Sequence, residues 1–161
     1  MISLLRVDNR LIHGQVATGW ISKSGASKIV VIDDKSAANE MLRDVLELAT
    51  PPGIALEVYS VAQAVDAWKQ DEFGSGKVMV IFKSIPGAFE AWKNGFAFAE
   101  LQVGGTVSGS DRKVFEGAIS LNAEEYQMLQ QMAAGGVAIT MQQTVQTHIT
   151  AWADAAKRFK F

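Results

Sequence analysis

A histidine stands directly before a glycine in the stretch RVDNRLIHGQV, which runs from Arg6 to Val16. The same stretch holds a carboxylate, Asp8, and a guanidinium, Arg10. A histidine ring nitrogen can act as a nucleophile, an arginine can bind the oxygens of a phosphate, and a nearby carboxylate can orient either group. The residue types at Asp8, Arg10 and His13 therefore suit the transfer of a phosphoryl group.

Short apolar runs rich in β-branched residues alternate along the chain with longer segments of helical spacing. The strand-like runs begin at Ile2, Lys28, Ile54, Lys77, Phe98, Gly117 and Gly136. KIVVID and VMVIF are almost continuously apolar, which is typical of central strands covered on both faces. The alternation predicts an α/β protein: a single three-layer α/β/α domain over residues 1–161 with an open, mostly parallel sheet.

The helical segments between these runs have recognisable ends. Residues 36–50 predict one amphipathic helix, with Met41, Leu42, Val45, Leu46 and Ala49 on its apolar face. Capping boxes are predicted at two further helix starts, Ser60 with Gln63 and Asn122 with Glu125. Another helix is predicted to start at Pro86, and THITAWADAAKRF, residues 147–159, is predicted to form the last.

The predicted architecture gives the histidine a place. In open parallel sheets, ligands bind in the loops that follow the carboxyl ends of the strands. The first strand is expected to end at Val7 and the next helix to begin near Gly14. His13 would then lie at a helix start, where unpaired backbone N–H groups favour anions. The backbone at Gly14 and Gln15 is therefore a candidate for binding phosphoryl oxygens.

Other loops at the same edge of the sheet hold further candidates, namely Asp33, Asp34, Lys35, Lys83, Ser84, Gly104, Gly105 and Thr106. The hydroxyl groups of Ser84 and Thr106 are able to hydrogen-bond a phosphoryl oxygen. A purely structural role competes with phosphoryl binding at each of these residues, because helix caps and turns commonly use these residue types. Asp34 would then cap a helix, and Gly104 would only provide a turn.

Composition excludes several classes of function. The formal net charge is −2 and the basic residues form no block, which does not favour a nucleic acid as partner. The chain has no cysteine, so disulfides, thiolate catalysis and cysteine-based zinc sites are excluded. The charged residues Arg6 and Asp8 interrupt the N-terminal stretch before it reaches the apolar length that a signal peptide needs. We therefore expect a protein of the reducing cytoplasm.

RVDNRLIHGQV resembles the active-site motif of the IIB components of the bacterial phosphoenolpyruvate-dependent sugar phosphotransferase system, in the mannose/fructose/sorbose family. Residues 30–34 (VVIDD), 81–84 (IFKS) and 101–106 (LQVGGT) resemble further family signatures in the same order. The lack of cysteine agrees, because several other IIB families carry the phosphoryl group on cysteine. The chain departs from the family pattern at three places. The family often has Asp at the position of Asn9 and Asn at the position of Gln102. A proline is common after the last strand, where this chain has none.

The resemblance implies a protein-N(pi)-phosphohistidine-sugar phosphotransferase. His13 would accept a phosphoryl group on Nδ1 from the phosphohistidine of a IIA protein or domain and pass it to a sugar. Arg10 and the amides near Gly14 would stabilise the transferring oxygens, and Asp8 would orient the ring or Arg10. The implied partners are IIA and the membrane components IIC and IID, with the protein attached peripherally to the transporter. The implied reaction needs neither a metal ion nor another cofactor. Assembly into a homo-oligomer is possible and is not decided by the sequence.

A rival hypothesis from another class stands beside this one. A noncatalytic regulatory α/β module would use the same loop to bind phosphate reversibly, because a fold does not guarantee a reaction. A phosphatase or mutase would ordinarily need a second histidine or an acid near the first, and the position of His148 does not suit that role.

Overall fold

The computed structural model describes residues 1–14 and 16–161. Seven strands form one sheet in the order β3-β2-β4-β1-β5-β8-β9. Every neighbouring pair is parallel except β8 and β9. In sheet order the strands cover Ala55–Tyr59, Lys28–Ile32, Val78–Phe82, Ile2–Asp8, Glu100–Gly105, Ala138–Met141 and Thr150–Ala151. The predicted open, mostly parallel sheet is confirmed.

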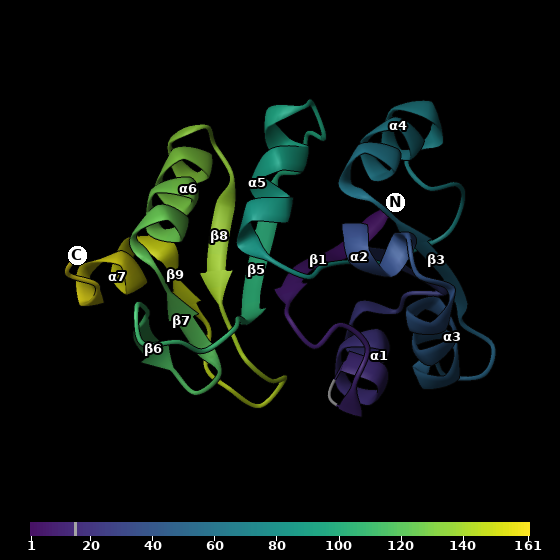
Figure 1. Cartoon of the computed structure of the whole chain (residues 1–161), viewed down its shortest axis with the longest axis horizontal. Helices are drawn as coiled ribbons and strands as arrows, with labels where there is room; N and C mark the ends of the chain where they lie inside the picture. The colour runs from purple at the N-terminus through teal and green to yellow at the C-terminus, as the bar shows by residue number, and fades with distance from the viewer. Residues whose placement is uncertain (15) are drawn as a thin grey trace.

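Helices cover both faces of this sheet, with α4, α5 and α6 on one side and α1 and α3 on the other (Figure 1). The helical elements are η1 (Val16–Trp20, a π-helical turn), α1 (Ile21–Ser24), α2 (Asp34–Ala37), α3 (Glu40–Ala49), α4 (Val61–Asp71), α5 (Ile85–Lys93), α6 (Ala123–Ala134), α7 (Trp152–Ala155) and η2 (Ala156–Arg158, a 3-10 turn). Among the described helices, none is both long enough and apolar enough to cross a bilayer. The three-layer prediction is confirmed.

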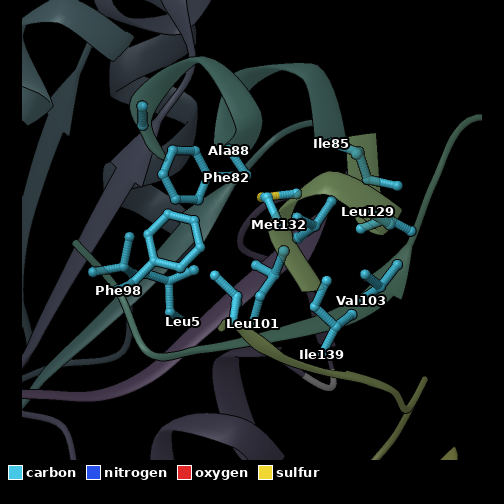
Figure 2. Packing of buried hydrophobic residues seen from close by; sticks show 14 of the residues in the cluster. Leu5, Phe82, Ile85, Ala88, Phe98, Leu101, Val103, Leu129, Met132 and Ile139 are labelled. Carbon is cyan, nitrogen blue, oxygen red and sulfur yellow. The ribbon is translucent and has the colours of Figure 1, made fainter. Parts of the chain in front are cut away.

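Two apolar clusters lie on the two faces of the sheet, and β4 contributes to both. Its side chains alternate: Val80 and Phe82 pack under α4, α5 and α6, whereas Met79 and Ile81 face η1, α1 and α3. Figure 2 shows the first cluster, in which side chains of β1, β5 and β8 meet those of α5 and α6. All five residues of β4 are fully buried, as expected for a central strand.

Local helix signals in the sequence are reproduced closely. Both predicted capping boxes form, at the starts of α4 and α6. α5 begins at Ile85, one residue before the predicted start, because the Ser84 side chain caps it by accepting a hydrogen bond from the Gly87 amide. These devices depend on residues three positions apart, which makes them legible in the sequence.

The single helix predicted over residues 36–50 is wrong. The chain forms two helices, because Asn39 is extended and its side chain accepts from the Leu42 amide to start α3. The predicted apolar face is also only partly used: Leu46 is buried, but Met41 and Val45 are exposed. A cleft of about 560 Å³ separates the charged side of α3 from the edge strand β3, so α3 covers little of the sheet.

The predictions for the C-terminal third need two corrections. Residues 147–159 do not form one helix, since Thr150 and Ala151 pair antiparallel with β8 and α7 starts only at Trp152. The strand predicted from Gly117 exists as β7 (Ile119–Leu121) but pairs only with β6 (Lys113–Glu116), in a separate hairpin. Both differences come from strand pairing, which a single-sequence pattern does not specify.

Leu46 and Leu48, two of the three leucines of α3, provide a test of its packing. Leu46→Ala should lower the free energy of unfolding by about 2 kcal/mol or more, because the side chain is 7% exposed and its removal leaves a cavity. Leu48→Ala, the same change at an 88% exposed position of the same helix, should change it by less than about 0.5 kcal/mol. Urea unfolding measures both values, and equal losses would contradict the described packing of α3.

Candidate active site

Asp8 lies at the carboxyl end of β1 and organises the candidate site. Its carboxylate is almost fully buried, and Oδ2 lies 3.1 Å from His13 Nε2 and 3.2 Å from Arg6 Nη2. The other oxygen, Oδ1, accepts a hydrogen bond of 3.1 Å from the backbone N–H of Arg10. An ionised carboxylate only accepts hydrogen bonds, so the facing Nε2 of His13 must carry a proton. Asp8 thereby orients both the ring and the loop.

The loop from Asp8 to His13 is held down by two apolar side chains. Leu11 and Ile12 are 4% and 6% exposed and belong to the cluster on the α1 face of the sheet. Leu11 has a φ of 59°, a left-handed conformation that is strained for a bulky residue. Tertiary packing compensates this strain and leaves the His13 side chain 19% exposed at the surface.

Arg6 is the central residue that the sequence analysis missed. Its guanidinium is 1% exposed and donates to Gln102 Oε1 at 2.5 Å, to the carbonyls of Gln142 and Gln143 at 2.9 and 2.6 Å, and to Asp8. Burial lowers the pKa of Arg6 from its ordinary value, against the opposing effect of the Asp8 charge. Arginine nevertheless stays protonated in proteins, so a permanent positive charge lies beside Asp8.

A signal for this role was present in the sequence. Arg6 interrupts the apolar strand ISLLRV, and an arginine in a buried strand must be paired. Its partners could not be named in advance, because they come from β5 and from the chain after β8. The indole ring of Trp20 covers the guanidinium, with Cζ 4.7 Å from the ring centroid.

Gly104 and Gly105 do not form the turn that was one interpretation of them, because they are the last residues of β5. A Cβ atom on Gly104 would lie 1.9 Å from Cζ of Arg6. A Cβ atom on Gly105 would lie 3.1 Å from Oδ1 of Asp8. Gly104 therefore provides the space that the guanidinium occupies, and the paired glycines let this strand pass close to the Arg6 and Asp8 side chains.

Arg10, the predicted oxygen-binding residue, is exposed. It lines a cavity of about 320 Å³ together with Asn9, Thr106 and Ser108. Among residues 1–14 and 16–161, no carboxylate forms an ion pair with Arg10. Its charge is therefore available to an anion that enters beside the His13 loop.

The remaining predicted residues have mixed positions. Gly14 is exposed next to His13, whose carbonyl accepts from the Ala17 amide in the helical turn that follows. Gln15 lies outside the described residues. Ser84 caps α5, and Lys83 Nζ donates to the Asn9 carbonyl at 3.2 Å, which ties β4 to the loop. Phosphoryl binding by Gly14, Gln15 and Ser84 stays a prediction.

Thr106 joins the site to the β6–β7 hairpin. Its hydroxyl donates to the Ser120 carbonyl at 2.6 Å and accepts from the Ser120 amide at 2.8 Å. The hairpin is fastened in turn to α6 by the buried ion pair of Arg112 with Glu125 at 2.5 Å. Thr106 thus has a structural task, and its predicted contact with a phosphoryl group stays a prediction.

Comparison with known proteins shows which family has this sequence and fold. A model of the family described as the PTS system sorbose subfamily IIB component matches residues 2–161. The chain belongs to this family. The resemblance to the IIB components of sugar phosphotransferase systems that the motifs indicated is thereby confirmed.

Individual relatives agree with this assignment. The sorbose-specific EIIB component of Klebsiella pneumoniae is 29% identical over 140 residues, which cover 87% of this chain and 85% of that protein. The crystal structure of the IIBSor domain of the sorbose permease from Klebsiella pneumoniae matches with a TM-score of 0.91 at 27% identity, covering 100% of this chain and 99% of that one. The mannose-specific EIIAB component of Escherichia coli K12 is 28% identical over 137 residues, which are 85% of this chain but only 42% of that protein.

Substitution of Gly104 tests the close packing around Arg6. Gly104→Ala should lower the free energy of unfolding by about 1–3 kcal/mol, because the new methyl group overlaps a buried guanidinium that cannot move freely. Gly109→Ala is the matched control, since its Cβ would closely approach only the exposed end of Asp111, at 2.9 Å, and would meet the Arg112 side chain at an ordinary van der Waals distance of 3.4 Å. Chemical denaturation measures both, and a Gly104→Ala variant as stable as Gly109→Ala would contradict the described position of Arg6.

Proposed function

We propose that this IIB component carries a phosphoryl group on Nδ1 of His13, taken from the phosphohistidine of a IIA protein and passed to a sugar. The observation that carries the proposal is the 3.1 Å contact between Asp8 Oδ2 and His13 Nε2. Because Nε2 holds the ring proton against Asp8, the lone pair of the neutral ring is on Nδ1. Asp8 therefore prepares Nδ1 as the nucleophile.

The charges near His13 suit a phosphoryl group in transfer. The exposed guanidinium of Arg10 can bind two phosphoryl oxygens, and backbone amides at Gly14 and Gln15 are further candidate donors. Donors that are already in position stabilise the charge of the transition state without reorganisation. Arg6 has a different role, because its buried guanidinium donates to Gln102, to two backbone carbonyls and to Asp8, and through Asp8 it acts on His13.

Transfer proceeds by in-line displacement in two steps. In the first, Nδ1 of His13 forms a bond to phosphorus while the N–P bond of the donor histidine breaks and its electron pair returns to that ring. The proton stays on Nε2 and donates to Asp8, whose negative charge balances the positive charge that the ring gains when Nδ1 bonds to phosphorus. In the second step a sugar hydroxyl oxygen attacks phosphorus, the N–P bond to Nδ1 breaks, and the hydroxyl proton passes to a base of the transporter.

The partners follow from this sequence of reactions. The donor is a IIA protein or domain, and the name EIIAB of the mannose-specific relative favours that partner. The acceptor sugar is bound by the membrane components IIC and IID, so the protein works in the cytoplasm and attaches peripherally to them. A single domain over residues 1–161 suffices for this carrier role.

The two histidines of the chain give a matched test of the carrier residue. Wild type incubated with phosphoenolpyruvate, the two general phosphotransfer proteins and a cognate IIA should gain one phosphoryl mass. His13→Ala should gain none, whereas His148→Ala should behave as wild type, because His148 is 65% exposed and pairs with Glu116, away from His13. Intact-mass spectrometry at mildly alkaline pH measures the modification.

The controls of this experiment decide between the functions. Phosphorylation of the IIA protein itself must be shown in the same sample. An unmodified wild type beside phosphorylated IIA would refute the carrier function and favour a noncatalytic phosphate-binding module. Modification that persists in His13→Ala would assign the carrier to another residue.

Asp8→Asn tests the tautomer argument. An amide side chain can donate as well as accept, so it no longer requires the proton on Nε2, and Nδ1 loses its lone pair in part of the molecules. The rate of transfer from IIA to His13 should fall by at least about 100-fold. Asp154→Asn, at a 75% exposed position, is the control and should keep the wild-type rate in rapid-quench measurements. A wild-type rate in Asp8→Asn would contradict the proposed role.

A further inference from the structure

We propose that Gln102 and Gln142 are positioning residues for phosphoryl transfer, acting on His13 through Arg6 and Asp8. This inference rests on the proposed function of His13 and adds residues to its site. The two glutamines are 8% and 4% exposed, and neither is a group that touches the phosphoryl in the mechanism above.

The two side-chain amides form a relay of hydrogen bonds. Gln102 is paired with Arg6 in the register of β1 and β5, and its Oε1 accepts from Arg6 Nη1 at 2.5 Å. Its Nε2 donates to Gln142 Oε1 at 3.2 Å. Gln142 Nε2 donates in turn to the Thr147 carbonyl at 2.9 Å. The relay therefore runs from the guanidinium to the segment that follows β8.

The two ends of the relay allow one orientation of both amides. A guanidinium only donates and a backbone carbonyl only accepts. Gln102 must therefore turn its oxygen to Arg6, and Gln142 must turn its nitrogen to Thr147. A flip of either amide would place like groups against each other inside the protein, where unsatisfied polar groups are costly. The relay is thus a rigid acceptor for Arg6.

A fixed Nη1 fixes the rest of the planar guanidinium. Trp20 covers one face of the group, so the hydrogen bonds at its edge control rotation within the plane. Nη2 is the atom that donates to Asp8 Oδ2, and the same oxygen faces His13 Nε2. A rotation that lengthens the Arg6 contact leaves Asp8 free to shift. The orientation and tautomer of His13 then lose their support.

Gln102→Leu tests the relay, with Gln130→Leu as its matched control. Gln130 also uses both ends of its amide, accepting from Trp152 Nε1 at 2.9 Å and donating to the Tyr126 hydroxyl at 3.1 Å, but on α6. Gln102→Leu should lower kcat for transfer from phosphorylated IIA by about 10- to 100-fold with KM for IIA unchanged. Gln130→Leu should leave both constants at wild-type values.

A spectroscopic signature separates positioning from a general loss of structure. The ¹⁵N chemical shifts of the His13 ring in the unphosphorylated protein should report a proton on Nε2 in wild type and in Gln130→Leu. Gln102→Leu should show a mixture of both tautomers. This measurement needs no partner protein, so it tests the relay even if IIA fails to phosphorylate wild type, a result that refutes the proposed function instead.

A second variant keeps the proposal testable if Gln102→Leu does not fold. Gln142→Leu retains Gln102 as the direct acceptor of Arg6 and should give a smaller loss of kcat with a correspondingly smaller change in tautomer. Where both variants fold, the double variant should be no slower than Gln102→Leu, because residues of one relay are not additive. A wild-type kcat in Gln102→Leu, or a reduced kcat with a wild-type tautomer, would overturn the proposal.

Discussion

The burial of one positive charge governs the edge of the sheet where the candidate site lies. The guanidinium of Arg6 is removed from water, and it cannot be neutralised by losing its proton. It must therefore be surrounded by acceptors, which come from Asp8 on its own strand, from Gln102 on β5 and from the chain after β8. Three segments that are distant in sequence are held together by this requirement.

The carboxylate of Asp8 links that structural requirement to chemistry. A single oxygen, Oδ2, faces both Arg6 and His13, so the carboxylate that pairs with the buried guanidinium also contacts the ring. The strained backbone at Leu11 then brings the histidine back over the end of β1. Under the proposed function, stability and nucleophile orientation depend on the same few contacts.

Tertiary packing overrode the sequence pattern where two signals competed. The apolar residues of 36–50 suggested one helix packed on the sheet, yet the side chain of Asn39 starts a separate helix, and Val45 of the predicted apolar face stays in solvent. Near the C-terminus, pairing with β8 extends Thr150 and Ala151, where helical spacing predicted a helix. Periodicity shows which apolar residues share one face of an element, but it does not show how much of that face a neighbouring element covers.

The sequence by itself determined the α/β class, the capped helix starts, and a loop in which Asp8, Arg10 and His13 follow Arg6 closely in sequence. These features depend on residues close together in the chain, so periodicity and residue type suffice to predict them. Only the tertiary structure decided that Arg6 is the anchor of the site and that Gly104 leaves space for it. Arg6 meets Gln102 and Gln142 across 96 and 136 positions of sequence, and such contacts exist only once strand order and register are set.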